Sequence, residues 1–517
     1  MNEARKMNNK LIRLIAFMLV SLMLLFAVAC DGGGNGDDSS DTLGNGNPDQ
    51  SNPSGSEEVT FEASGLPEDL NYGNKVSILY WQDRLEPEFE VKEISLDQVM
   101  NAIYWRNQNT IKTLGLDEKE GLTWTAMKGN EKNMADFAKQ VGASYAAGKG
   151  DYQIIAAYSR AAALCAINGY YADLAEIDGS YLDFSRRWWT PSLISNVTID
   201  DSIYFVSGDI STNTIHMMYG IFCNTDMLKE LKPQADPAQL AVDGDWTLDT
   251  FMGLCEGVYR DVNSNNKKDS GDRYGFVSKQ SYTEAFYNGA DLYLVDIDDT
   301  DVLKVSDDFT SVKTTTLVNK LIDFYQTIEV KGSGSPDNEF INQNALFAQN
   351  RMLHAQKYLS KVTFKYAVLP TPKYDDRQVG YRTAVDPNFT LWAVMKDVAK
   401  DEDMLVECSA VLECLAYEAY CNTTPKIFEN GLKVKYSDDE NINTVKCFDL
   451  IREGVVYDLG RIIPESELGG YMNEIFAQTI VGADAWSTEM NANRDLLKKN
   501  LAEIVKKIDK NKYGSGT

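Results

Sequence analysis

Apolar residues are arranged along this chain in two ways, as short continuous runs and at helical intervals. Continuous apolar runs at Val76–Trp81 and Tyr152–Ala157 predict two buried strands. Between these runs, residues 134–147 predict a helix, because Phe137 and Val141 stand four positions apart. Strands that alternate with helices at this spacing favour an α/β architecture.

Two more helices are predicted in the last quarter of the chain. The stretch Cys408–Tyr420 is strongly apolar and follows a polar cluster. The final helix is amphipathic, because apolar residues recur at intervals of four, three and four at Leu497, Leu501, Ile504 and Ile508. The sequence shows no internal repeat and no coiled-coil heptads.

The N-terminal segment has the pattern of an export signal. A basic start is followed by an apolar run of 16 residues, Leu14–Ala29, which is short for a bilayer-spanning helix of about 20 residues and suits a cleaved signal. Small residues lead into Cys30, and this stretch resembles a bacterial lipobox, although Ala27 stands where leucine is more usual. The resemblance implies a lipoprotein signal peptide over residues 1–29, with Cys30 lipidated, by palmitate for example. An ordinary secretory signal or an uncleaved anchor remains the alternative.

A polar segment follows Cys30. It is rich in Gly, Ser, Asn and Asp, and no Lys or Arg occurs between Cys30 and Lys75. Such a composition cannot bury enough apolar surface to offset its ordering entropy, so residues 30–71 are expected to form a disordered acidic tether. About 40 flexible residues reach roughly 35 Å. The protein is therefore expected to be lipid-anchored to the cell membrane and to face the extracellular side or the periplasm.

The charge of the chain excludes some partners. The formal net charge is -27, and removal of the signal peptide, whose own net charge is +3, leaves about -30. A body this acidic is a poor partner for nucleic acid or for anionic lipid surfaces. Neutral or cationic ligands are the natural candidates on this ground.

The cysteines after Cys30 do not form a metal or redox motif. None of their spacings is a CxxC pair, and several stand in apolar runs, so we expect mostly free, buried thiols. One disulfide within the last four remains open. The seven are Cys165, Cys223, Cys255, Cys408, Cys414, Cys421 and Cys447.

Seven segments, taken in order, resemble the extracellular solute-binding proteins of ABC importers, family 1, the carbohydrate-type group. The resemblance extends from about Lys75 to Ile508, and it depends on the order and spacing of the segments. They include GDYQIIAAYSRAAALCAINGYYADL (150–174), IYFVSGDISTNTIHMMYGIFCNTDML (203–228), GDWTLDTF (244–251), DVNSNNKKDSGDRYGF (261–276), ALFAQNRMLHAQKYLS (345–360), FKYAVLPTPKYDD (364–376) and GGYMNEIFAQTIVGADAW (469–486). Asn350, where glycine is usual, and the sequence Asp386-Pro387-Asn388 depart from the family pattern.

The resemblance implies a two-lobed, periplasmic-binding-protein-like α/β fold with interdigitated chain segments and a ligand cleft between the lobes. By analogy, lobe 1 holds residues 72–213 and 386–420, and lobe 2 holds residues 214–385 and 421–517. The chain would then cross between lobes near residues 212–217, 385–390 and 421–426. Closure of the lobes over a solute is a hinge motion. The implied partners are a small-molecule solute and the permease subunits of an ABC transporter, and we expect the protein to act as a monomer.

A cleft for sugars combines aromatic rings, which stack on the apolar faces of sugar rings, with polar groups that bind the hydroxyls. Tyr158 and Arg160 follow a predicted strand, where open α/β sheets place their ligands. Tyr358 closes a segment that in the family contributes an aromatic platform. For any single Trp or Tyr, core packing is the competing interpretation, and Trp188 and Trp189 are expected to clamp a surface loop. The ligand-binding candidates are Trp81, Tyr158, Arg160, Asp209, Tyr282, Tyr358, Trp392 and Trp486.

The sharpest local pattern predicts a Ca²⁺ loop over residues 261–272. Oxygen-bearing side chains occupy positions 1, 3, 5, 9 and 12, and position 7 would contribute a backbone carbonyl. Asn266 stands where an EF-hand has glycine, and asparagine tolerates positive φ better than most residues. An Asx-rich turn without metal is the alternative. The predicted ligands of this structural ion are Asp261, Asn263, Asn265, Lys267, Asp269 and Asp272.

The sequence argues against an enzyme. It has two histidines, His216 and His354, and contains neither an HExxH motif nor a GxSxG elbow nor a P-loop. A glycosidase needs only two carboxylates, so counting acids does not exclude one. The main hypothesis is a substrate-binding lipoprotein that captures an extracellular sugar or oligosaccharide. The alternatives are a binding lipoprotein for a peptide or polyamine, a lipoprotein scaffold and a surface glycosidase, and no organic cofactor is expected.

Overall fold

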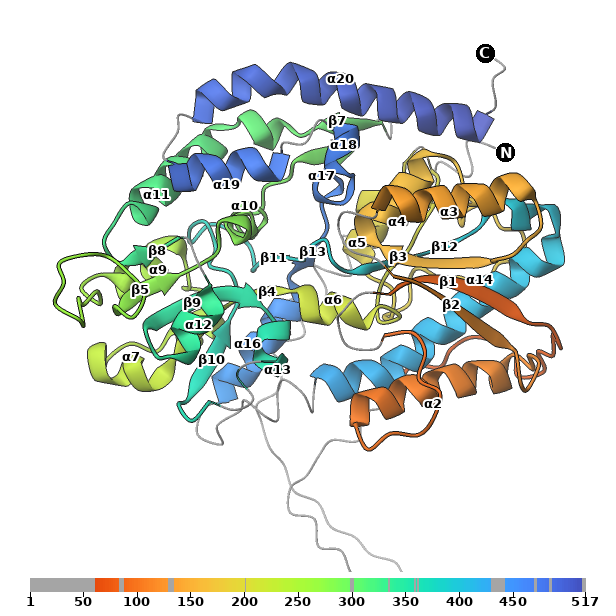
Figure 1. Cartoon of the computed structure of the whole chain (residues 1–517), viewed down its shortest axis with the longest axis horizontal. Helices are drawn as coiled ribbons and strands as arrows, with labels where there is room; N and C mark the ends of the chain where they lie inside the picture. Colours follow the sequence, from red (N-terminus) through yellow and green to blue (C-terminus); the bar gives the residue numbers. More distant parts are fainter. Residues whose placement is uncertain are drawn as a thin grey trace, which may run out of the picture. The chain divides into compact units, whose positions relative to one another are not determined.

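A four-stranded sheet contains strands from two distant parts of the chain (Figure 1). The computed structural model describes residues 61–513 except 83–87, 129–133, 200, 298–301, 333–334, 358, 360–361, 429–441, 469–471 and 483–485. The predicted signal peptide, Cys30 and most of the predicted tether therefore lie outside the described residues. The strands are β1 (Val76–Gln82), β2 (Leu122–Lys128), β3 (Ile154–Tyr158) and β12 (Thr390–Val394), in the order β12-β3-β1-β2. β1 is parallel to β2 and β3, and β12 is antiparallel to β3. Both strands expected from continuous apolar runs are thus confirmed, with the second displaced by two residues at its start.

Helices cover both faces of this sheet (Figure 1). α2 (Gln98–Thr113) and α14 (Glu402–Glu418) pack together on one face, and α3 (Met134–Ala147) and α4 (Ser159–Ile167) pack together on the other. The helix predicted over residues 134–147 is confirmed, with Phe137 and Val141 fully buried. α14 begins six residues before its predicted start because Asp401 caps it by accepting a hydrogen bond from the Met404 amide, at 3.1 Å.

A five-stranded sheet forms from the middle of the chain. Its strands are β4 (Tyr219–Asn224), β5 (Tyr274–Val277), β8 (Val330–Lys331), β9 (Ala345–Arg351) and β10 (Tyr366–Leu369), in the order β10-β4-β9-β5-β8. β5 is parallel to β8 and β9, while β4 is antiparallel to β9 and β10. α9 (Leu248–Cys255) buries Phe251, whose ring contacts Phe276 of β5 and Phe347 of β9.

Two described stretches of chain connect the two sheets, and a third begins at the end of α14. The first runs through α6 (Thr212–Met217) into β4, and the second runs from β11 (Thr383–Ala384) into β12. Val385 and Met218 form a bridge between these two stretches. The third leaves the first sheet after α14, whose end continues as a π-helical turn, η6 (Ala419–Thr423). The strands of each sheet come from the residues that the sequence assigns to one lobe, while the lobe boundaries stay a prediction.

The remaining elements lie around the two sheets. α20 (Trp486–Tyr513) packs on β7 and α18, and its last turns reach α4, where the Asn511 amide donates to the Ile167 carbonyl at 3.0 Å. Its predicted apolar stripe is confirmed, because all four residues are buried. The other elements are α5 (Pro191–Val197), α7 (Thr225–Leu231), α8 (Pro237–Asp243), η2 (Gln280–Tyr282), α10 (Ala285–Gly289), β6 (Val295–Ile297), β7 (Leu303–Val305), η3 (Asp307–Thr310), α11 (Val312–Tyr325), α12 (Pro336–Ile341), α13 (Leu353–Lys357), η5 (Lys396–Lys400), α16 (Ile442–Glu453), β13 (Val455–Val456), α17 (Leu459–Ile462), α18 (Glu465–Leu468) and α19 (Met472–Gly482).

The cysteine side chains of this fold are mostly buried. All seven cysteines after Cys30 are free thiols, and six of them are buried. Burial raises the pKa of Cys165 and of Cys447 to about 12, which disfavours the reactive thiolate. In the described part of the chain, no helix combines the length and the apolar character needed to cross a membrane.

Candidate functional site

The carboxyl ends of strands from the two sheets meet at a cluster of polar and aromatic residues. β3 of the first sheet ends at Tyr158 and leads into Arg160, while β9 of the second sheet ends at Arg351. In open α/β sheets, ligands bind outside the carboxyl ends of the strands. We call this cluster the junction. It comprises Arg160, Tyr219, Lys279, Tyr282, Glu284, Arg351, Asp386, Asn388 and Arg461.

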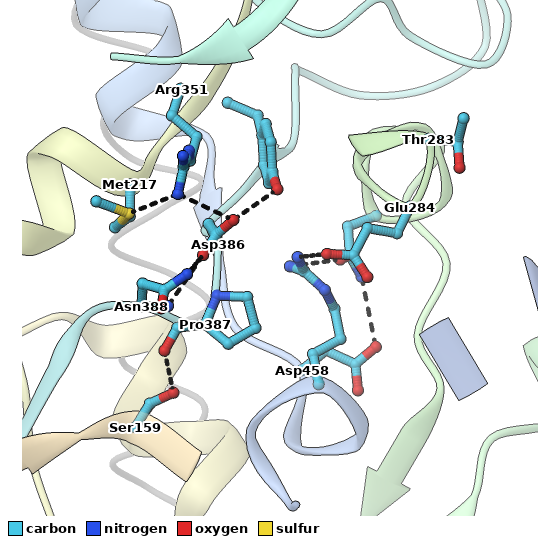
Figure 2. Close-up of polar contacts among 12 residues, drawn as sticks. Ser159, Met217, Thr283, Glu284, Arg351, Asp386, Pro387, Asn388 and Asp458 are labelled. Atoms are coloured by element: carbon cyan, nitrogen blue, oxygen red, sulfur yellow. Dashed lines mark hydrogen bonds and ion pairs between the residues drawn. The ribbon is translucent and has the colours of Figure 1, made fainter. Parts of the chain in front are cut away.

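Asp386 holds the two sides of the junction together (Figure 2). Its Oδ2 accepts a hydrogen bond from the Tyr219 hydroxyl at 2.9 Å and lies 3.5 Å from Nη1 of Arg351. Its Oδ1 accepts from the Asn388 amide N–H at 3.0 Å. Burial opposes the charge of Asp386, but Arg351, Asn388 and Tyr219 together lower its pKa below the ordinary value. The neighbouring residue, Pro387, accepts a hydrogen bond from the Ser159 hydroxyl at 2.6 Å, which fixes the start of α4.

A second ion pair lies beside the first (Figure 2). Nη2 of Arg461 is 2.6 Å from Oε1 of Glu284, and Nη1 donates to the Asn288 side-chain oxygen at 3.2 Å. Nε of Arg160 donates to the backbone carbonyl of Arg461 at 3.2 Å. Asp458 accepts from the backbone amides of Leu294, Val295 and Gly460, and burial raises its pKa. These contacts attach the segment around α17 to both sheets.

An aromatic pair completes the junction. The rings of Tyr219 and Tyr282 meet edge to face, with centroids 5.3 Å apart. The ammonium of Lys279 and the guanidinium of Arg351 each lie 5.6 Å from the Tyr282 centroid. Cations at this distance from a ring face are attracted by its quadrupole. Tyr282 therefore has an apolar ring surrounded by cations, and burial raises the pKa of its hydroxyl.

The structure brings four of the eight predicted ligand-binding residues close to the carboxyl end of β3 or β5. Arg160 and Tyr282 belong to the junction. Tyr158 precedes Arg160 and stacks on Trp81, with ring centroids 5.6 Å apart. Tyr158 and Trp81 are both about 95% buried, so their rings contact protein here. Their contact with a ligand stays a prediction.

The other predicted residues lie apart from the junction. Trp392 is fully buried and donates from Nε1 to the Ser211 hydroxyl at 3.0 Å. Trp486, the first residue of α20, packs between Phe309 and Phe476. Asp209 is bound by the Thr424 hydroxyl at 2.8 Å and by Arg452 at 3.2 Å, and burial raises its pKa. Tyr358 lies outside the described residues.

Several junction residues were not among the sequence candidates. Arg351 is the last residue of β9, and nothing in the sequence of that strand predicts its ion pair. Its partner, Asp386, lies 35 positions further along the chain. The unusual sequence Asp386-Pro387-Asn388 was the available signal. Two hollows of about 530 and 280 Å³ lie elsewhere, and Lys268 lines both.

The predicted Ca²⁺ loop forms a closed turn. Asn266, at the EF-hand glycine position, has φ of 58°, and Asp261 accepts hydrogen bonds from the amides of Asn265 and Asn266. The side-chain amides of Asn263 and Asn265 donate to the two oxygens of Asp269, at 3.1 and 2.6 Å. The Asp269 carboxylate thus accepts from two asparagine side chains in this structure. A hard cation selects oxygen ligands, so both side-chain amides would have to turn their oxygens toward it.

Asp272 has a different position from the other four. It is fully buried, and its carboxylate accepts from the amides of Val262 and Asp269 and from the Tyr259 hydroxyl. Among the described residues, no group of three or more His, Cys, Asp or Glu side chains is arranged to hold a metal ion. A cation in this loop would therefore depend on the amide oxygens of Asn263 and Asn265 and on the Lys267 carbonyl.

Comparison with known proteins shows the fold. No family model and no curated protein matches the chain. Solved structures do match. A cyclic α-maltosyl-1,6-maltose binding protein of Arthrobacter globiformis is 11% identical, with 83% of this chain and 99% of that one covered and a TM-score of 0.55. An ABC substrate-binding protein of Listeria monocytogenes, solved with cycloalternan, is 12% identical over 83% and 100% of the two chains, with a TM-score of 0.52. A cyclo/maltodextrin-binding protein complexed with maltotetraose is 13% identical over 86% and 100%, with a TM-score of 0.51.

The chain thus has the two-lobed α/β fold of periplasmic-binding-protein-like solute-binding proteins, as the sequence resemblance implies. These neighbours are binding proteins rather than enzymes.

Proposed function

We propose that this protein is the substrate-binding lipoprotein of an ABC importer, which captures an extracellular sugar or oligosaccharide and delivers it unaltered to a membrane permease. The observation that carries the proposal is the two-lobed fold, shared over more than four fifths of the chain with proteins solved with bound glucans. The junction supports it, because polar and aromatic groups from both sheets meet where such folds bind ligands. Cys30 would anchor the protein through the acidic tether of residues 30–71. Lobe 1 would hold residues 72–213 and 386–420, and lobe 2 would hold residues 214–385 and 421–517.

A thermal-shift screen tests this function. The purified protein is heated with oligosaccharides, with polyamines and with short peptides, each over a range of concentrations. A ligand that binds only the folded state at 100 times its Kd stabilises that state by about 2.7 kcal/mol. We expect a saturable rise of several degrees in Tm with one class of sugar. A rise with polyamines or peptides alone would instead identify the alternative ligand, and release of shorter glycans during incubation would identify a glycosidase.

We also propose that the loop of residues 261–272 binds one structural Ca²⁺ ion, which stabilises the connection between α9 and β5. Removal of calcium with a chelator is expected to lower Tm by several degrees and to leave sugar affinity unchanged, because the loop is separate from the junction. Added Ca²⁺ should restore Tm better than Mg²⁺, whose small octahedral shell fits such a loop poorly. Asp269→Ala should abolish the chelator effect. Asp249→Ala, which removes an exposed carboxylate paired with Lys320, should keep it; equal Tm with and without chelator would contradict the ion.

A further inference from the structure

We infer that α20 is a strap between the two lobes, and that Asn511 near its end holds them in the arrangement seen in this structure. The helix begins among the elements of the second sheet, against α11 and α19, and its last turns lie against α4 of the first sheet (Figure 1). The inference concerns the two-lobed fold. It goes beyond the proposed function and does not depend on which solute the protein binds.

Most of the strap is fixed to the lobe built on the second sheet. Trp486, at its start, packs between two phenylalanine rings from η3 and α19. One turn before Asn511, Nζ of Lys507 lies 2.8 Å from a carboxylate oxygen of Glu467 in α18. A helix of 28 residues is about 42 Å long, and each turn is hydrogen-bonded to the next. The far end of α20 therefore moves with the second lobe.

That far end is seated in a socket on the first lobe, formed by Ile167, Gly169 and Lys396. The side-chain amide of Asn511 donates to the Ile167 carbonyl at 3.0 Å. The Asn511 carbonyl, one of those at the helix end that lack an intrahelical partner, accepts from Nζ of Lys396 at 2.7 Å. Gly169 has φ of 77°, and a Cβ at this position would lie 2.5 Å from Cγ of Asn511. The missing side chain of Gly169 thus leaves the space that Asn511 fills.

The socket lies at a distance from the stretches of chain that connect the two sheets. The Ser159 hydroxyl, at the start of α4, donates to the Pro387 carbonyl in the second of these connections. Ile167 ends this nine-residue helix, about 12 Å away. A rotation of one lobe by about 15° displaces a group at that distance by about 3 Å, which breaks a hydrogen bond. Another lobe angle therefore requires that Asn511 leave the socket.

Other contacts of the C-terminal segment with the first lobe lie beside the connections. β13 pairs with β11, and the ring of Tyr457 contacts that of Phe389, with centroids 5.2 Å apart. The Asn196 side chain donates to the Tyr457 carbonyl at 2.6 Å. Because these groups are close to the connections, a lobe rotation displaces them less than it displaces Asn511.

The separation of the lobes tests the strap. Spin labels are attached through a keto amino acid at the exposed positions Lys139 of α3 and Lys229 of α7, so that the seven native thiols stay unmodified. Pulsed electron–electron resonance then gives the distribution of lobe separations in the ligand-free protein. A neutral hydrogen bond changes an equilibrium constant about fivefold, so Asn511→Ala should raise the fraction of molecules outside the main separation by about that factor.

Gly169→Ala tests the socket from the other side. The added methyl group displaces Asn511, so the same fraction should rise about tenfold or more. Both changes together should act no more strongly than Gly169→Ala alone, because the three atoms nearest to the added Cβ all belong to Asn511. Gly257→Ala is the matched control, since Gly257 also has a positive φ of 69° but a Cβ there meets no atom within 4 Å. It imposes similar backbone strain and should leave the distribution unchanged.

Urea unfolding of each variant accompanies these measurements. A contact that only stabilises the fold would lower the stability of Asn511→Ala and leave the lobe separations unchanged, and that result would overturn the strap. A distribution that broadens as much in Gly257→Ala as in Gly169→Ala would overturn it as well. Because no ligand is added, neither result bears on the proposed sugar-binding function, which the thermal-shift screen tests separately.

Discussion

Replacement of Arg461 by methionine is expected to lower the free energy of unfolding by about 3–5 kcal/mol. The Arg461 side chain is 4% exposed, and its Nη2 lies 2.6 Å from Glu284, whose side chain is 11% exposed. Methionine fills much of the volume but leaves the Glu284 carboxylate buried without its cation. The urea midpoint of the purified protein measures the loss, and an unchanged m-value shows that the folded state is retained.

A double variant distinguishes a broken ion pair from lost packing. Arg461→Met with Glu284→Gln removes both charges, and replacement of both members of a buried pair is often close to neutral. It should therefore recover most of the stability lost in Arg461→Met. Arg377→Met is the matched exposed control and should stay within about 0.5 kcal/mol of the parent protein. A double variant as unstable as the single one would show that the loss comes from the packing and the Asn288 hydrogen bond of Arg461 rather than from an unpaired Glu284 charge.

Local patterns along the sequence predicted those elements whose burial follows from spacing alone. Phe137 and Val141 define the buried face of α3, and the four apolar residues from Leu497 to Ile508 define that of α20, because a helix places such positions on one face. The start of α14 was predicted too late, since the polar residues before it form its cap and first turn. The π-helical turn at Ala419–Thr423 carries no periodic signal that separates it from the preceding helix.

Contacts between distant parts of the chain could not be predicted in the same way. Asp209 is a ligand candidate because it lies near a predicted strand end, and its ion pair with Arg452, 243 positions away, has no local sequence signal. Trp392 is fully buried and its ring contacts Trp124 and Phe89, which no local pattern around position 392 predicts. The pairing of Arg351 with Asp386 depends on how β9 and the start of β12 approach each other. Tyr158 and Arg160 were predicted to lie at a strand end, where open α/β sheets bind ligands, and this general rule holds for any residues at that position.

The tryptophans of the loop SRRWWTP were expected to hold that loop, and the structure shows how. Nε1 of Trp188 and Nε1 of Trp189 each donate to the Glu413 carboxylate, at 2.8 Å, and the amide of Asp183 donates to it as well. Glu413 lies on α14 and is 1% exposed. One buried carboxylate thus ties the loop of residues 183–189 to the helix, although it has no cation among these donors.

Burial of Glu413 makes the stability of the protein depend on pH. Desolvation raises the pKa of Glu413 from 4.5 to about 7, and the hydrogen bonds from Trp189, Asp183 and Trp188 offset only part of that rise. In the unfolded chain the group has its ordinary pKa, so between about pH 4.5 and pH 7 the folded state holds a proton that the unfolded state has lost. The stabilisation is complete below pH 4.5 and disappears as the pH rises through 7. At about 1.4 kcal/mol for each pH unit, the loss is about 3 kcal/mol.

Glu413→Gln isolates this contribution from those of all other titrating groups. The two indoles donate to different oxygens of Glu413, and glutamine replaces one of these oxygens by an amide nitrogen. The variant therefore loses a fixed amount of stability at every pH, but it takes up no proton at this position. The stability of the parent protein minus that of the variant should therefore fall by about 3 kcal/mol between pH 4.5 and pH 8, measured by urea unfolding at each pH. Glu503→Gln, at an exposed position paired with Lys506, should leave that difference near zero throughout. A parallel pH profile for the parent and Glu413→Gln would mean that the two indoles keep the buried carboxylate charged in the folded state, and that the loop is held by an anion rather than by a protonated acid.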